Sequence, residues 1–399
     1  MNEESIETFR NSPPVGGGGS IVVIADDLTG AAELAGIGWR YSLDAELFMS
    51  FIETDDVYIP LFVVCTDSRS LNKENAESVT TRIAKEISLM APDHIYKKID
   101  SVFRGHVLDE LRIEMDQLSL KKALIIGANP SLGRTITDGR YFINGDPISE
   151  TDFGKDPEFA ITDSSVLRMI RAAAGEVSVL KHTDDLPEEG IVIGEAVSGE
   201  DILAWTKRVD SGWLLAGAGD FFTALLNKEY KAGIKPAISI GLPHLYVSGT
   251  AFGKARAFIK EIKQTQNCVA YLTTAMMETE DINDEAWYNI VEEMLSKHKK
   301  AVIAINDEDV NPWNVSPVYL RTTMAKVVRK ILDKGNIKEL FIEGGSTAAA
   351  VLNELGIKKL SVVNELKRGI VRMKANDLYI TVKPGSYPLP EQIEKLYTS

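Results

Sequence analysis

The sequence predicts an α/β protein made of two three-layer domains with mostly parallel sheets. Short β-branched runs alternate with amphipathic stretches from Ile21 to the end of the chain, and this alternation is typical of parallel α/β architecture. The length of 399 residues leaves room for two domains of ordinary size. The composition, with 44% hydrophobic and 26% charged residues, is that of a globular protein able to bury sizeable cores.

The predicted elements form two series. The first has strands at 21–25, 45–50, 60–66, 94–99 and 122–127, with helices at 30–41, 73–90 and 105–119. The second has strands at 243–248, 268–273, 301–305, 338–343 and 359–363, with helices at 250–265, 283–299, 317–334 and 346–355. Each strand run is short and rich in aliphatic residues, as strands buried on both faces are.

The domain boundary is expected near residue 235. The run KEYKAGIKPA follows a helical stretch and contains Gly233 and Pro236, which favour a linker. We therefore expect a first domain at 21–235 and a second at 236–399. Residues 1–20, which end in PPVGGGGS, are expected to be a flexible tail.

One stretch interrupts the alternation. Residues 129–157 are rich in Gly, Pro and Asp, and the pattern TIT followed by RYFIN predicts a hairpin. A connection of nearly 30 residues without a helix is long, and functional loops are often long connections of this kind.

Charge and apolar content exclude several classes of protein. The net charge of −14 disfavours non-specific binding to nucleic acid or to anionic membranes. The aliphatic runs are too short to cross a bilayer. Cys65 and Cys268 both lie in apolar runs, which suits buried thiols in a reducing cytoplasm. We expect a cytoplasmic protein that acts on small molecules, with self-association left open.

Three nucleotide or metal signatures do not fit. GTAFGKA at 249–255 has the wrong glycine spacing for a P-loop and ends in Ala255 where Ser or Thr must hold magnesium. GAG at 217–219 lacks the third glycine of the dinucleotide fingerprint. The five histidines form no closely spaced pair, so no metal-ligating residue is assigned.

Adjacent carboxylates follow the first strand. In IADDLTGAAELA, Asp26 and Asp27 stand at the carboxyl end of the strand, where open α/β sheets bind ligands. Thr29 or Gly30 is expected to cap the following helix, and an Asp beside it can accept a proton from a bound hydroxyl. The competing interpretation is that an Asp here serves only as the helix cap.

A second cluster, YKKIDSVFRGH at 96–106, supplies a local basic site in an acidic protein. Its chemistry suits a small hydroxy-carboxylate, with Arg104 as a bidentate clamp on the carboxylate. The alternative is a solvated ion pair. The cluster contributes Lys98, Asp100, Ser101 and Arg104, and Arg134 and Arg140 of the long loop are expected to complete the pocket.

Three glycine-containing turns follow predicted strands in the second half. They are SGT at 248–250, EGGSTAAAVL at 343–352 and KPGSYP at 383–388. Such turns before helices expose backbone N–H groups and can cradle phosphates. One turn alone is a weak signal, whereas three in one α/β domain favour a nucleotide site.

These motifs, in this order, resemble the four-carbon acid sugar kinases, which act on threonate, erythronate or 3-oxo-tetronate. The resemblance rests on IADDLTGA, KKIDSVFRG, GRTITDGRYF, DPISETDFGKDP, EGGSTAAAVL and KPGS, and runs from Ile21 over almost the whole chain. It implies transfer of the ATP γ-phosphoryl group to the terminal hydroxyl of the acid, with Mg²⁺, in a cleft between the domains.

The resemblance also implies residue roles. The acid-sugar site is matched by Asp26, Asp27, Lys98, Asp100, Ser101 and Arg104, and the ATP site by Ser248, Thr250, Gly344, Gly345, Ser346, Thr347, Gly385 and Ser386. Asp27 is our first choice for the general base, followed by Asp26 and Asp100, because Asp100 is expected to pair with Lys98.

The sequence departs from the family pattern at two places. It reads DSVFRGH where many members have DSTLRGN, and KPGSYP where a GNFG-type turn is commoner. Two other functions remain open: a sensor that binds the acid without turnover, and a hydrolase with Asp26 and Asp27 as metal ligands.

Overall fold

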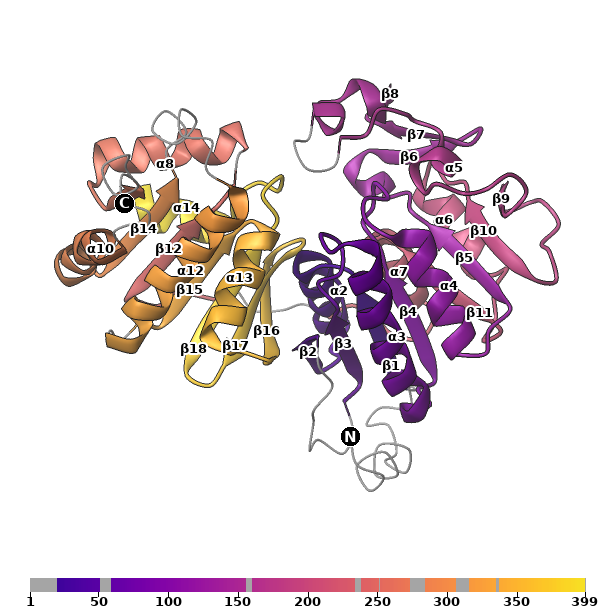
Figure 1. The fold of residues 1–399 in the computed structure, drawn as a ribbon, viewed down its shortest axis with the longest axis horizontal. Helices are drawn as coiled ribbons and strands as arrows, with labels where there is room; N and C mark the ends of the chain where they lie inside the picture. Colours follow the sequence, from indigo (N-terminus) through magenta and orange to yellow (C-terminus); the bar gives the residue numbers. More distant parts are fainter. Residues whose placement is uncertain are drawn as a thin grey trace. The chain divides into compact units, whose positions relative to one another are not determined.

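The computed structural model describes residues 20–50, 59–155, 160–233, 238–250, 252–272, 284–305, 316–334 and 337–398. The chain divides into two compact units, Met1–Gly233 and Ile234–Ser399 (Figure 1). The expected tail up to residue 19 and the expected boundary at residue 235 lie outside the described residues. None of the helices in the described ranges combines the length and apolar character needed to span a bilayer.

A parallel sheet forms the centre of the first unit. Its strands, in spatial order, are β2 (Ala45–Met49), β3 (Leu61–Cys65), β1 (Ile21–Ala25), β4 (His94–Lys98), β11 (Trp213–Gly217), β5 (Lys122–Ile126), β10 (Gly190–Gly194) and β9 (Val177–Leu180). The pairings between these neighbours are parallel. All these strands therefore end at one edge of the sheet, as the α/β prediction requires.

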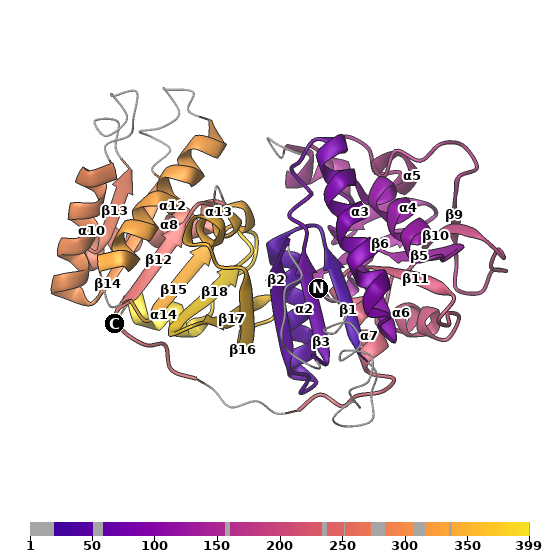
Figure 2. The same cartoon turned by 60° about the horizontal axis from the view of Figure 1, so that its bottom comes forward.

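Helices cover both faces of this sheet. They are α2 (Leu28–Arg40), α3 (Lys73–Met90), α4 (Val107–Gln117), α6 (Gly199–Thr206) and α7 (Gly219–Leu226), and the four-residue helix α5 (Val166–Met169) follows the long loop. Successive residues of β4 point to opposite faces, and Lys97 meets α4 while Lys98 meets Glu33 of α2. Helices α3 and α4 pack together on one face, and α2, α7 and α6 on the other (Figure 2).

The central strands are apolar because both of their faces are buried. Every residue of β1 and β3 is buried. Val22 and Ile24 of β1 pack with Ile83 and Ile87 of α3 in one apolar cluster. Full burial of these side chains contributes roughly 1.5–3 kcal/mol each.

The long loop contains the predicted hairpin. Strands β6 (Arg134–Thr137) and β7 (Arg140–Ile143) pair antiparallel, and β8 (Asp146–Pro147) extends the sheet. Short 3-10 helices η1 (Pro130–Leu132), η2 (Ile148–Glu150) and η3 (Asp152–Lys155) flank it. The chain from 129 to 155 is thus ordered around a small second sheet.

The second unit has a mixed sheet. Strands β13 (Val269–Leu272), β14 (Lys300–Ile305), β12 (His244–Ser248), β15 (Glu339–Glu343) and β18 (Leu378–Lys383) are parallel neighbours in that order. Strands β17 (Ile370–Ala375) and β16 (Lys359–Lys367) continue it antiparallel.

Helices of the second unit also form two groups. Helices α10 (Asp284–His298), α12 (Pro317–Lys334) and α13 (Gly345–Leu355) pack in sequence, and α8 (Gly253–Thr265) packs with α14 (Glu391–Thr398). Ile259 and Ile393 of the second group join Tyr246 and Phe341 of the sheet in one apolar cluster. Both units are therefore built on α/β sheets that are mostly parallel.

The structure adds strands to the predicted series. Strands β9 and β10 lie beyond the long loop, and β16 is longer than the predicted 359–363 because it pairs with β17 across a turn at Gly369. Helix α2 begins at Leu28, two residues before the predicted start, because Asp27 caps it.

Candidate functional site

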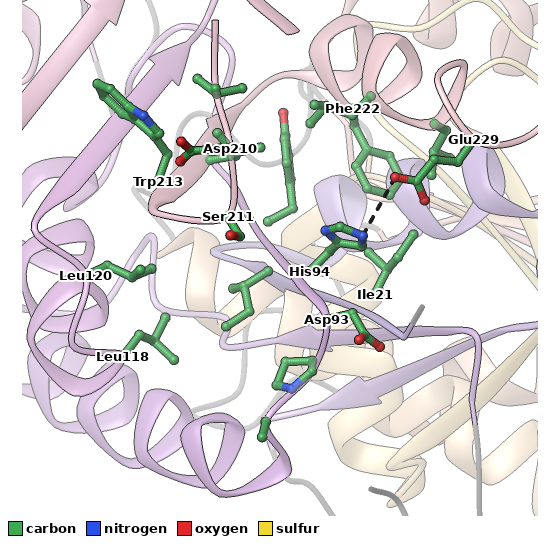
Figure 3. Close-up of a pocket in the computed structure, with 18 of the residues that line it drawn as sticks. Ile21, Asp93, His94, Leu118, Leu120, Asp210, Ser211, Trp213, Phe222 and Glu229 are labelled. Atoms are coloured by element: carbon green, nitrogen blue, oxygen red, sulfur yellow. Dashed lines mark ion pairs between the residues drawn. The ribbon is translucent and has the colours of Figure 1, made fainter. Parts of the chain in front are cut away.

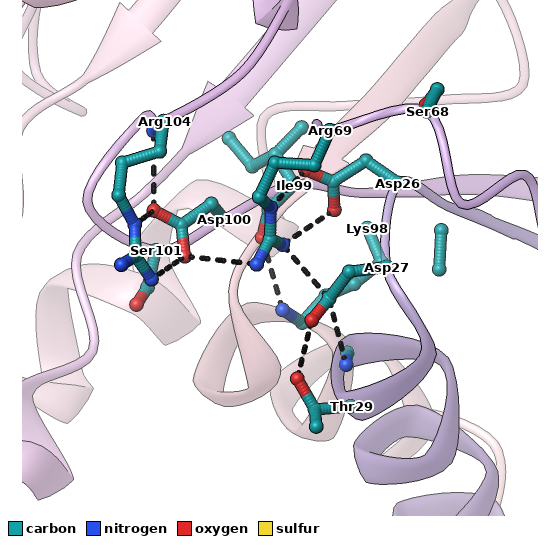
Figure 4. Close-up of polar contacts among 12 residues, drawn as sticks. Asp26, Asp27, Thr29, Ser68, Arg69, Lys98, Ile99, Asp100, Ser101 and Arg104 are labelled. Atoms are coloured by element: carbon teal, nitrogen blue, oxygen red, sulfur yellow. Dashed lines mark hydrogen bonds and ion pairs between the residues drawn. The ribbon is translucent and has the colours of Figure 1, made fainter. Parts of the chain in front are cut away.

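Three strand ends meet in the first unit. Ala25, the last residue of β1, is in register with Cys65 of β3 and Lys98 of β4. The loops that follow carry three groups of polar side chains: Asp26 and Asp27 after β1, Ser68 and Arg69 after β3, and Asp100 to Arg104 after β4 (Figure 4). The register of the sheet brings together residues that are more than 70 positions apart.

Arg69 lies at the centre of this group. Its Nε and Nη2 donate to the two carboxylate oxygens of Asp26, each at 2.8 Å. Nη2 also donates to Asp27 Oδ1 at 2.8 Å, and Nη1 lies 3.7 Å from Asp100 Oδ1. One guanidinium thus compensates the adjacent carboxylates of Asp26 and Asp27, which would otherwise repel each other.

Asp27 is the N-cap of α2. Its Oδ1 accepts a hydrogen bond from Gly30 N at 2.9 Å, and its Oδ2 accepts one from the Thr29 hydroxyl. The expectation that Thr29 or Gly30 caps the helix was wrong, because only the Asp27 carboxylate reaches the first-turn N–H group. The capping interpretation of Asp27 is confirmed, and it leaves a catalytic role open.

The expected pairing of Lys98 with Asp100 is also wrong. Lys98 Nζ donates to the Ile99 carbonyl at 3.0 Å and lies 3.5 Å from Glu33 Oε2 of α2. Asp100 instead accepts from Arg104 Nε at 2.8 Å, Nη2 at 3.0 Å and backbone N at 3.1 Å. The chain leaves the strand after Lys98, so the alternation of side chains does not extend to Asp100.

Arg134 approaches the same group from the hairpin. Its Nη1 donates to the Ser101 hydroxyl. The guanidinium carbons of Arg134 and Arg104 lie 5.6 and 5.7 Å from the centroid of the Phe153 ring, within cation–π distance. Among the described residues, no carboxylate pairs with Arg134, whereas Arg69 and Arg104 both bind aspartates.

Arg140 does not join the group. It lies at the far end of the hairpin, where it pairs with Thr137, and its side chain is exposed. Arg134 and Arg140 stand at opposite ends of the paired strands β6 and β7. The fold therefore brings only Arg134 to the polar group at the ends of β1, β3 and β4.

Burial and charge separate the pKa values of the three aspartates. Burial raises the pKa of Asp26, and the Arg69 charge offsets this only in part. Burial acts the same way on Asp27, but Arg69, Lys98 and the capping hydrogen bonds outweigh it and lower the pKa. The Arg104 and Arg69 charges overcome burial at Asp100 and hold its pKa far below the usual range. Asp27 and Asp100 are therefore ionised at neutral pH.

A buried ion group lies beneath the site. Lys97 Nζ is 2.6 Å from Glu110 Oε2 and 2.7 Å from Glu114 Oε1 of α4, and all three side chains are buried. Glu110 also accepts from the Ser68 hydroxyl at 2.5 Å, next to Arg69. Burial raises the pKa of Glu114 to about 7, with the Lys97 charge opposing it. Two carboxylates thus share one ammonium group.

A cavity of about 630 Å³ lies at the opposite edge of the same sheet. Its lining includes Ile21, His94 and Trp213 at the starts of β1, β4 and β11, and His94 lies 3.8 Å from Glu229 (Figure 3). None of the residues predicted to bind substrate lines this cavity. The polar group therefore remains the candidate site of the first unit.

The three glycine-containing turns of the second unit contact one another. They follow β12, β15 and β18, which are neighbours in the sheet. Gly249 N donates to Glu343 O at 3.1 Å, and Gly344 N to Lys383 O at 2.9 Å. A Cβ added to Gly249 would stand 1.9 Å from Thr347 Oγ1, and one added to Gly385 would stand 2.4 Å from Thr250 Oγ1. Only glycine permits this approach.

Helix α13 begins within this group of turns. Gly344 is its N-cap, with φ +106° and no side-chain cap, and Thr347 is buried in the first turn. The first N–H groups of α13 are therefore not covered by a capping side chain, which is the arrangement that binds phosphates at helix N-termini. Tyr387, in the KPGSYP turn after β18, packs against Gly369 and the apolar cluster of the second unit.

Two family models match the chain, one in each compact unit. Residues 21–224 match the family described as a sugar-binding N-terminal domain, and residues 245–387 match the nucleotide-binding C-terminal domain. A D-threonate kinase of Salmonella typhimurium is 24% identical over 92% of this chain and 95% of its own length. A D-erythronate kinase of Heliobacterium modesticaldum is 23% identical over 87% and 88%, and a 3-oxo-tetronate kinase of Brucella melitensis 22% identical over 92% and 92%.

The chain belongs to the four-carbon acid sugar kinase family. Two solved structures share the fold of this family member. A Salmonella typhimurium protein has a TM-score of 0.79 at 16% identity, covering 95% of this chain and 98% of its own. A Haemophilus influenzae protein has a TM-score of 0.72 at 19% identity, covering 94% and 98%.

Sequence reasoning missed two residues of this candidate site. Arg69 follows β3, and its position after a predicted strand was the signal available, since the same signal identified Asp26 and Asp100. Phe153 lies in the long loop, where nothing in the sequence distinguishes it from other loop aromatics. Its contact with two arginines depends on how the loop folds back.

Proposed function

We propose that this protein transfers the γ-phosphoryl group of ATP to the terminal hydroxyl of a four-carbon sugar acid. The observation that carries the proposal is the pairing of two sites in a chain of this family. The first unit gathers arginines and aspartates at three strand ends, and the second gathers three glycine-containing turns at a helix N-terminus.

We assign the substrate carboxylate to Arg134. Arg104, expected from the sequence to be the clamp, donates two side-chain hydrogen bonds to Asp100. Arg134 contacts Ser101 and Phe153 and has no carboxylate partner among the described residues. A planar guanidinium held by a hydroxyl and an aromatic ring suits a carboxylate ligand, whose negative charge would balance that of the arginine. Ser101, Lys98 and Arg104 would then orient the hydroxyls of the acid.

Asp27 remains the proposed general base. It is ionised at neutral pH, and its side chain is 14% exposed, whereas that of Asp26 is 4% exposed and held in the Arg69 fork. A carboxylate that can reach the acceptor hydroxyl removes its proton as the bond to phosphorus forms. Asp26 and Asp100 follow as second and third choices.

The turns of the second unit are proposed to bind the phosphates of ATP. Gly345, Ser346 and Thr347 would supply first-turn donors, Gly344 would form the turn that exposes them, and Thr250, Gly385 and Ser386 would close the cradle. Within the described residues, no cluster of three or more His, Cys, Asp or Glu side chains is arranged to hold a metal ion. The aspartates of the first unit bind arginines, so Mg²⁺ would be held mainly by the nucleotide phosphates and neutralise their charge.

The same contacts argue against a hydrolase with Asp26 and Asp27 as metal ligands. Arg69 donates to both carboxylates, and a dication beside that guanidinium would meet like charge. A sensor without turnover is the remaining alternative, and activity measurements separate it from a kinase.

The test is ADP release by the full-length protein with ATP and Mg²⁺, in the presence of D- and L-threonate, D- and L-erythronate and the 3-oxo acids. We expect ADP release that depends on one of these acids, with a phosphorylated acid as product. Binding of an acid without ADP release would indicate the sensor, and phosphate release without any acid would indicate a hydrolase.

A further inference from the structure

One buried ion pair connects the strands that lead into the three turns. Glu343 is the last residue of β15 and directly precedes Gly344, and Lys383 is the last residue of β18 and precedes Pro384 and Gly385. Lys383 Nζ donates to Glu343 Oε1 at 2.5 Å, and the two side chains are 1% and 0% exposed. The pair is therefore buried at the strand ends, directly before the turns.

The third strand is attached to the same carboxylate. Glu343 Oε2 accepts from the Ser248 hydroxyl at 3.0 Å and from the Tyr246 hydroxyl at 2.5 Å, both in β12. Ser248 directly precedes Gly249 and Thr250. The Ser248 side chain is buried and donates to Glu343. Ser248 therefore joins the SGT turn to the ion pair.

Lys383 also holds its own turn. Its Nζ donates to the carbonyl of Pro384 at 3.0 Å and to that of Gly385 at 3.4 Å. Within the described part of the chain, the hydrogen bonds of this ammonium group thus go to Glu343 and to the KPGS turn. A lysine so engaged and so buried is not placed to reach a phosphate itself.

We propose that Glu343 and Lys383 are positioning residues that set the nucleotide affinity of the second unit without touching the nucleotide. This inference rests on the proposed function. The pair fixes the ends of β12, β15 and β18 relative to one another, and the turns that follow pack within van der Waals contact at Gly249, Gly344 and Gly385. A phosphate cradle made from three separate turns needs such a link, because preorganised donors bind more tightly than mobile ones.

The experiment compares Mg·ADP binding by calorimetry with the KM for ATP, the KM for the acid and kcat, using the full chain. Glu343→Gln and Lys383→Met each leave one buried charge uncompensated, and we expect each to weaken nucleotide binding at least tenfold. The KM for the acid is expected to stay within about twofold, because the acid site is in the other unit. Tyr246→Phe is the matched control. It removes one hydrogen bond to the same carboxylate from a residue that does not adjoin a turn, and we expect a change in nucleotide affinity below about twofold.

The double variant Glu343→Gln with Lys383→Met separates positioning from stability. It has no buried uncompensated charge, so its resistance to urea should recover towards wild type. The side-chain link from β18 to β15 is still missing, so its nucleotide affinity should stay at least tenfold weaker. Recovery of affinity together with stability would overturn the inference, as would normal affinity in folded single variants. Failure of the wild-type protein to bind Mg·ADP would instead reject the proposed function.

Discussion

Arg69 binds Asp26 through two parallel hydrogen bonds of 2.8 Å. The aspartate is almost completely buried and the arginine nearly so, and the same guanidinium reaches Asp27. This relationship shapes the electrostatics of the candidate acid site, because one arginine that follows β3 offsets the carboxylates that follow β1.

Arg69→Gln is predicted to destabilise the protein strongly. Removing one partner of a buried ion pair leaves an uncompensated charge and typically costs about 3–5 kcal/mol. Urea unfolding at pH 7 measures the loss. In the double variant Arg69→Gln with Asp26→Asn we expect a substantial part of the stability to return, since the more buried of the two carboxylates bound by Arg69 is then neutral. A single variant as stable as wild type would contradict this account.

Arg134→Gln is predicted to raise the KM for the sugar acid by roughly 10- to 150-fold, the equivalent of about 1.5–3 kcal/mol for a charge-assisted hydrogen bond. The Kd for ATP should not change. Arg140→Gln is the matched control, since it removes the same charge from the other strand of the hairpin and should leave the KM for the acid unchanged. Equal effects of the two variants would show that the general positive charge of the loop matters and a specific clamp does not.

Asp27→Asn is predicted to lower kcat at least a hundredfold while the affinities for acid and ATP are largely retained. Asparagine is as good an N-cap as aspartate, so α2 should be preserved and its helicity should be unchanged by circular dichroism. Asp26→Asn, made in parallel, tests the second choice. If both variants keep near-normal kcat, no base from this pair is required.

Gly249→Ala is predicted to weaken nucleotide binding about tenfold or more. Its new Cβ would lie 1.9 Å from Thr347 Oγ1, so the first turn of α13 must move. Gly253→Ala is the control four residues later, where an added Cβ meets no atom within 4 Å. We expect normal Mg·ADP binding for the control, and normal binding by Gly249→Ala would place the phosphate cradle elsewhere.

Glu114→Gln is predicted to remove a pH dependence of stability. The pKa of Glu114 is raised from 4.5 to about 7 in the folded chain. Between these values the folded state holds a proton that the unfolded state has lost, so this group's stabilisation is complete below pH 4.5 and is lost as the pH rises through 7. The loss is about 1.4 kcal/mol per pH unit within that window. Urea unfolding at pH 5 and pH 7.5 should show the decline in wild type relative to Glu114→Gln, and parallel values for both proteins would contradict it.

Much of the fold could be predicted from local pattern alone. Strands such as β1 and β3 are short apolar runs bounded by polar turns, and α3 has a clear amphipathic period with Asn72 as its cap. The polar motifs after β1, β4, β12, β15 and β18 could be identified for the same reason, since position after a strand is a property of the sequence.

Partners within the site could not be predicted, because they depend on the register between strands. Lys98 and Asp100 are two residues apart, yet Lys98 meets Glu33 of α2, whereas Asp100 meets Arg104 and Arg69. The fold of the long loop likewise decides that Arg134 reaches Ser101 and Phe153, whereas Arg140 lies at the far end of the hairpin.

The sequence by itself determined the α/β class, the order of the elements and which strand ends carry polar or glycine-containing turns, because hydrophobic period and turn chemistry are local. Only the tertiary structure decided that Arg69 joins Asp26 to Asp27 and that Glu343 joins Ser248 to Lys383. Those contacts span 40 to 95 positions along the chain. They arise when neighbouring parallel strands align their carboxyl ends, so that buried charges find compensating partners that no local pattern encodes.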